Sequence, residues 1–286
     1  KFDVVFITIF PAYTALIGPL LVRRFKVPFV LDYQDPWVNA WGASVGGGPR
    51  GDVDFKSWAS RRLAQTLEPY AVRAAGALTA VSPGTYEPIL LRNPTAHPIT
   101  TAIPLGAEPK DFGTERPAST LPFDVSDGLA HICYTGTVLP LGLETLTALL
   151  RATAVLRDRR PELYRRLRLH FVGTSNQTVP TDQMRVMPLA RELGVADVVQ
   201  EIPTRLPYSS IVRVQQQATG LLALGSSEPH YTASKIFPLL LARRPLLAVY
   251  HEESTVTGIL RRVAKGPSVR LVTYSDHDRA DTRTEA

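Results

Sequence analysis

Hydrophobic residues along this chain form short apolar runs that alternate with longer stretches in which apolar positions recur every three or four residues. The short runs predict buried strands, and the longer periodic stretches predict amphipathic helices. In the first part of the chain, the predicted strands are 3–9, 28–33, 78–81 and 99–103, and the predicted helices are 12–24, 54–75 and 84–92. Strands and helices that alternate at this spacing predict a parallel sheet with helices on both faces.

A segment from Lys110 to about Ala130 is rich in Pro, Ser, Thr, Asp and Gly and shows little periodicity, so we place a domain boundary there. The predicted domains are 1–115 and 116–286. The second half repeats the alternation, with strands at 131–134, 167–172, 198–202, 220–224 and 246–249 and helices at 142–157, 181–193, 208–217 and 235–242. Because 286 residues exceed the usual size of a single core, two α/β domains are expected. Ligands of open α/β sheets bind outside the carboxyl ends of the strands, so the predicted site is a cleft between these domains.

Composition excludes several classes of protein. The single cysteine, Cys133, rules out an internal disulfide and a Cys-rich metal site, and it fits a reducing compartment. Six His residues have no metal-ligand spacing, so no metal is expected. Basic residues do not form blocks with interleaved aromatics, so nucleic-acid binding is not predicted. Pro11 and Pro19 interrupt the apolar N-terminal segment, which argues against a transmembrane helix. The net charge of +6 predicts at most a weak attraction to anionic substrates or lipid head groups.

The stretch 231–253 carries the clearest chemical signal. Ser234 and Lys235 precede an apolar run of helical length, and Arg243 and Arg244 follow that run. Free backbone N–H groups and a lysine at a helix N-terminus suit an anion such as a diphosphate. The alternative interpretation is an ordinary helix–strand pair of an α/β protein.

Several segments, in this order along the chain, resemble the GT-B glycosyltransferases, specifically the family 4-like group. The segments that carry the resemblance are Asp32-Tyr33-Gln34-Asp35-Pro36-Trp37, Ala80-Val81-Ser82-Pro83-Gly84, 103–112, and the strand–loop–helix–strand order from Leu221 to Val249. The resemblance implies two Rossmann-like parallel-sheet domains that face a cleft, with a donor side at 116–286 and an acceptor side at 1–115. It also implies a nucleotide-diphosphate sugar as co-substrate, retention of anomeric configuration, and no cofactor or metal. It further implies a fragment that lacks the family's first strand, its glycine-rich loop and its C-terminal crossover helix.

On the donor side, the resemblance assigns Gly136 and Thr137 to the phosphate loop and Arg205 to the loop beside the nucleotide base. The basic pair that usually follows the glycine is replaced by apolar residues 138–141. A turn glycine and a solvated loop arginine are the alternatives without function.

The family's paired acids align with His230 and Pro238, and neither is acidic. Glu228 is a candidate substitute for the first acid, and His230 is a candidate donor to a sugar hydroxyl or the β-phosphate. Pro238 has no side-chain donor or acceptor and substitutes for nothing. Ser234 and Lys235 are assigned to the diphosphate, and Glu253 is a secondary donor-side candidate.

On the acceptor side, Asp35 and Trp37 follow a predicted buried strand. Asp35 is the candidate catalytic residue that orients or deprotonates an acceptor hydroxyl, and Trp37 is the candidate platform for a sugar ring. Gln34 aligns with the position where some family members carry a His at the reaction centre. A structural Asp that caps the loop before Pro36 is the alternative.

The sequence therefore predicts a glycosyltransferase that moves a sugar from a nucleotide-diphosphate donor to a glycan, lipid-linked or small-molecule acceptor in polysaccharide biosynthesis. The expected location is cytoplasmic or peripheral on the inner face of the cell membrane. Two alternatives remain: a catalytically weak GT-B-like accessory subunit and a nucleotide-sugar 2-epimerase of the same fold.

Overall fold

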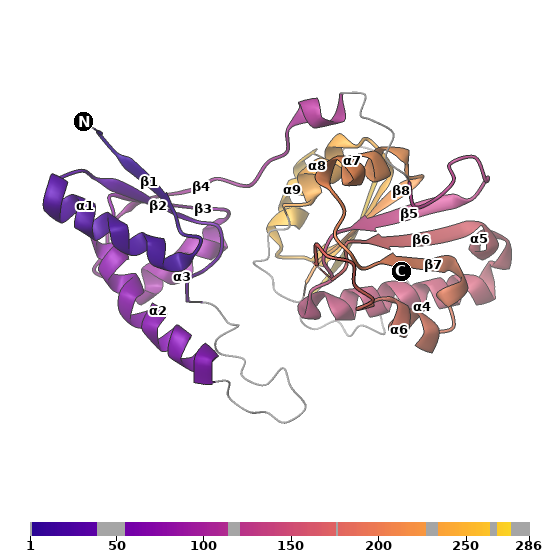
Figure 1. Cartoon of the computed structure of the whole chain (residues 1–286). Coiled ribbons are helices and arrows are strands. Elements are labelled where there is room, and N and C mark those ends of the chain that lie inside the picture. Colours follow the sequence, from indigo (N-terminus) through magenta and orange to yellow (C-terminus); the bar gives the residue numbers. More distant parts are fainter. Residues whose placement is uncertain are drawn as a thin grey trace. The chain divides into compact units, whose positions relative to one another are not determined.

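The computed structural model describes residues 2–38, 55–113, 121–175, 177–226, 234–263 and 268–275. The chain divides into two compact units, Lys1–Leu105 and Gly106–Ala286, each of which is an α/β unit with a parallel sheet (Figure 1). This division falls earlier than the boundary predicted between residues 115 and 116. The reason is local, because Phe112 packs against the core of the second unit and its carbonyl accepts a hydrogen bond from Gln216 Nε2 at 2.8 Å.

The first unit contains a four-stranded parallel sheet in the order β1-β2-β3-β4. Its strands are β1 (Val5–Thr8), β2 (Phe29–Tyr33), β3 (Ala77–Ala80) and β4 (Ile99–Ala102). Its helices are the 3-10 helix η1 (Ala12–Leu16), α1 (Ile17–Phe25), α2 (Phe55–Ala74), which continues through Pro69, and α3 (Pro83–Arg92).

One face of this sheet forms the core of the first unit. Ile7, Leu31 and Leu78 are neighbours in register across β1, β2 and β3, and all three are buried against residues of the helices. Phe6 and Ile99 lie on the other face and are exposed. Among the described residues of this unit the helices thus cover one face, so the expectation of helices on both faces is wrong here.

A buried ion pair joins α2 to the end of α3. Glu68 is 1% exposed, and its carboxylate accepts hydrogen bonds from Arg92 Nε at 3.0 Å and Nη2 at 3.1 Å. The backbone N–H of Val38 also donates to Glu68, which ties the segment after β2 to α2. Burial raises the pKa of Glu68 above its ordinary value, and the neighbouring Arg92 charge opposes that rise.

The second unit contains a six-stranded parallel sheet in the order β10-β9-β8-β5-β6-β7. Its strands are β5 (Ala130–Thr135), β6 (Leu167–Val172), β7 (Val199–Ile202), β8 (Gly220–Leu224), β9 (Leu246–His251) and β10 (Val269–Tyr274). Its α-helices are α4 (Leu143–Arg159), α5 (Pro161–Arg166), α6 (Met187–Glu192), α7 (Tyr208–Gln217), α8 (Ile236–Leu241) and α9 (Thr255–Val263). Short 3-10 helices are η3 (Pro109–Phe112), η4 (Pro140–Gly142) and η5 (Ala196–Val198).

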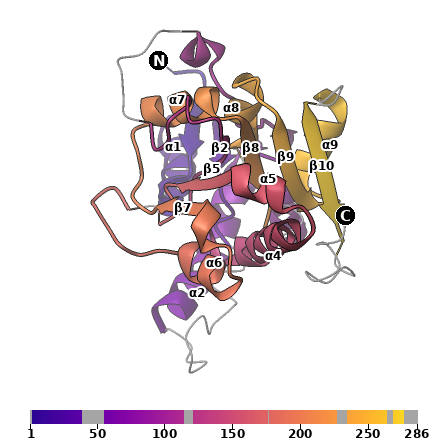
Figure 2. The same cartoon turned by 90° about the vertical axis from the view of Figure 1, so that its right-hand side faces the viewer.

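Helices cover both faces of this sheet, as the sequence predicts. Cys133, Leu221 and Ala248 pack against α7, α8 and α9, whereas Tyr134 and Phe171 pack against α4, α5 and α6. The helices around the second sheet can be followed in Figures 1 and 2. Both units are Rossmann-like, so the predicted fold class of two parallel-sheet α/β domains is confirmed.

Within the described segments, no helix combines the length and the apolarity that a bilayer crossing requires.

The predicted helix 181–193 is wrong in its first half, because α6 begins only at Met187. Glu201 decides the start: its buried carboxylate accepts the backbone N–H groups of Arg185, Val186 and Met187 at 2.8–2.9 Å. A carboxylate at this position satisfies N–H groups that have no partner within the helix. Strand β10 and helix α5 were not predicted, although Val269–Tyr274 is rich in the β-branched and aromatic residues that favour strands.

A polar chain crosses β5, β6 and β7. His131 Nδ1 lies 2.9 Å from His170 Nε2, His170 Nδ1 lies 2.8 Å from Gln200 Oε1, and His131 Nε2 lies 3.0 Å from Asp127. The ring of Phe123 stacks on His131 at 4.5 Å. Burial lowers the pKa of His170 to about 4, and the neighbouring His131 and Arg168 act in the same direction.

This pKa makes the second unit sensitive to acid. Between pH 6.5 and 4 the unfolded chain binds a proton at His170 that the folded chain does not, so stability falls as the pH falls through this window. The loss is on the order of 3 kcal/mol at full protonation. We expect His170→Asn to flatten this pH dependence in urea unfolding followed by circular dichroism. An unchanged slope between pH 7 and 5 would show that His170 is not the responsible group.

Candidate functional site

The strand order of the second unit marks one place for a ligand. From β5 the chain proceeds outward through β6 and β7, and it then returns to the other side of β5 with β8. The reversal of direction makes the gap between β5 and β8 a topological switch point, and ligands of open α/β sheets bind at the carboxyl ends of the strands at such a point. The first unit has the order β1-β2-β3-β4 and therefore no such reversal within its described sheet.

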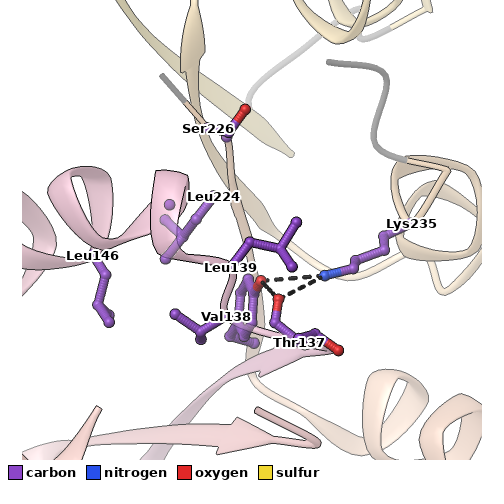
Figure 3. Close-up of a pocket in the computed structure, with 10 residues that line it drawn as sticks. Thr137, Val138, Leu139, Leu146, Leu224, Ser226 and Lys235 are labelled. Atoms are coloured by element: carbon purple, nitrogen blue, oxygen red, sulfur yellow. Dashed lines mark hydrogen bonds between the residues drawn. The ribbon is translucent and has the colours of Figure 1, made fainter. Parts of the chain in front are cut away.

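A small pocket lies at this switch point (Figure 3). Its lining comes from the end of β5 and the following loop, from the start of α4, from the end of β8, and from the segment before α8. The lining residues are Tyr134, Thr137, Val138, Leu139, Gly142, Leu146, Leu224, Gly225, Ser226 and Lys235. At about 20 Å³ the pocket holds roughly one water molecule, so it is the floor of a site and not a complete sugar pocket.

Lys235 supplies the positive charge of this pocket. Its Nζ donates to Tyr134 Oη at 3.2 Å and to the carbonyl of Thr137 at 3.3 Å, and it lies 5.1 Å from the centre of the Tyr134 ring. Tyr134 Oη also donates to the Thr137 carbonyl at 2.9 Å. Figure 3 shows the lysine reaching from its loop toward Thr137. Both of these oxygen partners are neutral, and a lysine ammonium group is a compact charge that attracts anions such as a diphosphate.

Gly136 provides the space that Lys235 occupies. Its φ of 131° lies in a region that favours glycine, and a Cβ at this position would lie 2.5 Å from Lys235 Nζ. Its backbone N–H is used by the carbonyl of Val172 at 2.8 Å, so it does not point at a ligand. Gly136 therefore acts by admitting the lysine side chain over the backbone.

A network of hydrogen bonds supports the loop after β5. The Val138 N–H donates to the Thr174 carbonyl at 3.0 Å, and the Val138 carbonyl accepts from Arg185 Nη1. Thr174 Oγ1 in turn donates to Glu201 at 2.5 Å. The same buried Glu201 that starts α6 thus also fixes the pocket loop.

The structure brings together three of the predicted donor-side residues: Gly136, Thr137 and Lys235. Ser234 adjoins Lys235, but α8 contains only six residues and begins after both, so its dipole is small. The helix N-terminus lies beside Ser234 and Lys235, where the sequence predicts it, and the charge of Lys235 is the main feature of the pocket. Pro238 lies within α8, and its carbonyl accepts from the Ala242 N–H at 3.0 Å.

The other predicted donor-side residues lie around this centre. Arg205 follows β7 and lies close to Gly173, which follows β6, and to Gly136, which follows β5. A Cβ built on Gly173 would lie 3.8 Å from the Cα of Arg205 and 4.0 Å from the Cα of Gly136. The loops after β5, β6 and β7 are therefore neighbours. Glu253 is exposed after β9, and Ser254 next to it caps α9 by accepting the Val256 N–H at 3.2 Å. Glu228 and His230 lie outside the described residues.

The sequence does not predict a role for Tyr134 or Tyr274 in this site. Tyr134 reads as the apolar end of a strand, and only the fold shows its hydroxyl beside Lys235. Tyr274 ends β10, and its hydroxyl donates to the Ser226 carbonyl at 2.7 Å, which fixes the loop after β8. No sequence signal marks such a contact, because it joins strands that are not neighbours in the sheet.

The acceptor-side candidates follow β2 in the first unit. Asp35 is exposed, whereas Trp37 is partly buried and packs against the core cluster of that unit. Asp32, which the sequence reasoning did not select, is the buried carboxylate of this region at 8% exposure.

Comparisons with known proteins identify the fold. Sucrose-phosphate synthase from Thermosynechococcus elongatus matches with a TM-score of 0.60 at 14% identity, over 100% of this chain and 63% of its own. A UDP-forming trehalose-phosphate synthase from Burkholderia xenovorans matches with a TM-score of 0.60 at 12% identity, over 99% of this chain and 64% of its own. HepE from Anabaena, solved in complex with UDP-glucose, matches with a TM-score of 0.59 at 13% identity, over 99% and 67%.

The fold is GT-B. At these identities the similarity establishes the fold alone, and this chain spans less than two thirds of the length of the two synthases. No protein-family model matches the sequence, and the search of curated proteins finds no similar chain.

Proposed function

We propose that this protein transfers a sugar from a nucleotide-diphosphate sugar to a hydroxyl acceptor. The observation that carries the proposal is the position of Lys235 in a pocket at the β5–β8 switch point, beside Gly136 and the loop after β5. The structural similarity to HepE with bound UDP-glucose supports the same type of donor. The family 4-like assignment, on the motifs quoted above, is part of this proposal.

In the proposed mechanism, Lys235 stabilises the diphosphate as it departs with its negative charge. This is electrostatic catalysis by a preorganised charge, and it lowers the barrier to the extent that the charge grows in the transition state. Tyr134 keeps the ammonium group in place through its hydroxyl and its ring. We further propose that the configuration at the anomeric carbon is retained and that no metal or cofactor takes part.

For the acceptor side we propose residues 1–115, with Asp35 orienting the attacking hydroxyl and Trp37 contacting a sugar ring. The acceptor is a glycan, a lipid-linked sugar or a small molecule, and polysaccharide biosynthesis in the cytoplasm is the proposed setting. The basic character of the chain, with a net charge of +6, suits weak association with an anionic membrane. An accessory subunit and a 2-epimerase gain no support from the observed site.

Calorimetric titration of UDP, GDP and their glucose conjugates into the full chain tests this function. We expect one nucleotide to bind selectively, and Lys235→Ala to weaken its binding by roughly ten- to a hundredfold, because a charge-assisted hydrogen bond contributes about 1.5–3 kcal/mol.

Lys235→Met is the companion variant, because it removes the charge and keeps most of the aliphatic stem. Arg191→Ala, on the exposed side of α6, removes one positive charge from the same unit and should leave the affinity unchanged. Equal affinities for the wild type and both Lys235 variants would refute the donor site. The absence of binding by every nucleotide would instead favour an accessory role.

A further inference from the structure

A buried carboxylate lies at the carboxyl edge of the sheet in the first unit. Thr8, Asp32 and Thr79 are direct neighbours in register across β1, β2 and β3. Because these parallel strands end at the same edge, the three side chains meet where the loop carrying Asp35 and Trp37 begins. Asp32 is only 8% exposed, and its carboxylate lies against the side chains of Thr8 and Thr79 and does not face solvent.

Both carboxylate oxygens of Asp32 are occupied by donors. Oδ1 accepts from Thr79 Oγ1 at 2.7 Å, and Oδ2 accepts from Gln34 Nε2 at 2.6 Å and, more weakly, from Thr8 Oγ1 at 3.4 Å. A group so fully engaged and so little exposed is poorly placed to contact a substrate itself. Its effect on a ligand must pass through one of its partners.

Gln34 is the partner through which it can act. An ionised carboxylate only accepts hydrogen bonds, whereas an amide donates from its nitrogen and accepts at its oxygen. The contact at 2.6 Å therefore decides which way the Gln34 amide faces: Nε2 toward Asp32, and Oε1 away from it. Gln34 is half-buried, and within the described part of the chain its Oε1 accepts no hydrogen bond.

From this arrangement we infer that Asp32 is a positioning residue that holds the Gln34 amide so that its Oε1 accepts a hydrogen bond from the acceptor hydroxyl. The inference rests on the proposed function for the identity of that hydroxyl. An amide oxygen is far too weak a base to remove the proton, so Gln34 orients the hydroxyl and leaves deprotonation to a carboxylate such as Asp35. The two residues after β2 thus have separate tasks at one edge of the sheet.

The orientation of the amide is tested first, by nuclear magnetic resonance on the ¹⁵N-labelled full chain. The Gln34 side-chain signals are assigned by their loss in Gln34→Leu. We expect one amide proton to be shifted downfield and protected in the wild type, and both effects to vanish in Asp32→Asn. Thr79→Val is the matched control, because it removes a donor from the same carboxylate and leaves the Gln34 contact in place. Gln34 signals that are identical in the wild type and Asp32→Asn would overturn the inference.

A double-mutant cycle then tests the consequence, with UDP-glucose as donor and glucose as acceptor probe. We expect Asp32→Asn and Gln34→Leu each to raise the KM for the acceptor by about tenfold, with the donor KM unchanged, and the double variant to be no worse than Gln34→Leu. Additive effects, or a loss shared by Thr79→Val, would show a purely structural role and reject the inference. If the wild type transfers to no probe, the proposed function fails, while the resonance data still decide the orientation of Gln34.

Discussion

Gly136→Ala is expected to impair the second unit in two ways. The new Cβ would lie 2.5 Å from Lys235 Nζ and 2.7 Å from its Cε, so the flexible lysine must leave its place over the loop. We therefore expect UDP affinity to fall at least about tenfold. The φ of 131° disfavours any side chain, which adds a loss of stability of roughly 1–3 kcal/mol. Calorimetry measures the first effect, and urea unfolding followed by circular dichroism measures the second.

Gly128→Ala separates these two effects. Gly128 also has a positive φ, 76°, but a Cβ there meets no atom within 4 Å. The control variant should lose stability and keep its affinity for UDP. If Gly136→Ala binds UDP as tightly as Gly128→Ala does, then the position of Lys235 over Gly136 does not matter for the nucleotide.

Arg92→Leu is expected to destabilise the first unit by about 3–5 kcal/mol, because it leaves the charge of Glu68 buried and unpaired. All three tryptophans, Trp37, Trp41 and Trp58, belong to the first unit, so tryptophan fluorescence during urea unfolding reports on that unit alone. Arg160→Leu is the control and is followed by circular dichroism, because it lies in the second unit: its ion pair with Glu162 is exposed on both sides, and such pairs contribute about 1 kcal/mol or less.

The pH dependence of Arg92→Leu gives a second criterion. The pKa of Glu68 is already raised by burial, so its folded form favours the proton and stability is lost as the pH rises through that pKa. Removing Arg92 removes the charge that lowers this pKa, so the pKa rises further. The deficit of the variant should therefore be largest at pH 7.5 and smaller at pH 5.5, and Glu68→Gln in the Arg92→Leu background should recover much of it. A deficit that is equal at both pH values, or no larger than that of Arg160→Leu, would contradict the role assigned to this pair.

The sequence determined the alternation of strands and helices, because an apolar run such as Leu246–Val249 or a periodic stretch such as Tyr208–Gln217 is fixed by local burial and propensity. It also indicated Lys235 and Gly136, since a lysine before an apolar run and a glycine after a strand are local signals. The motifs that resemble GT-B glycosyltransferases pointed to the fold that the comparisons with solved structures bear out.

Tertiary structure alone decided the remaining features. The start of α6 depends on Glu201 from β7, the strand that follows it, the site of Lys235 depends on Tyr134, and the orientation of Gln34 depends on Asp32 in its row with Thr8 and Thr79. Apart from the contact between Gln34 and Asp32, which are two residues apart, these side chains find their partners across neighbouring strands or loops, and the strand order that makes them neighbours is set by how the whole sheet packs. A linear pattern reports which residues become buried, but it does not report which buried polar groups meet, and that pairing determines where charge and hydrogen bonds are available for a ligand.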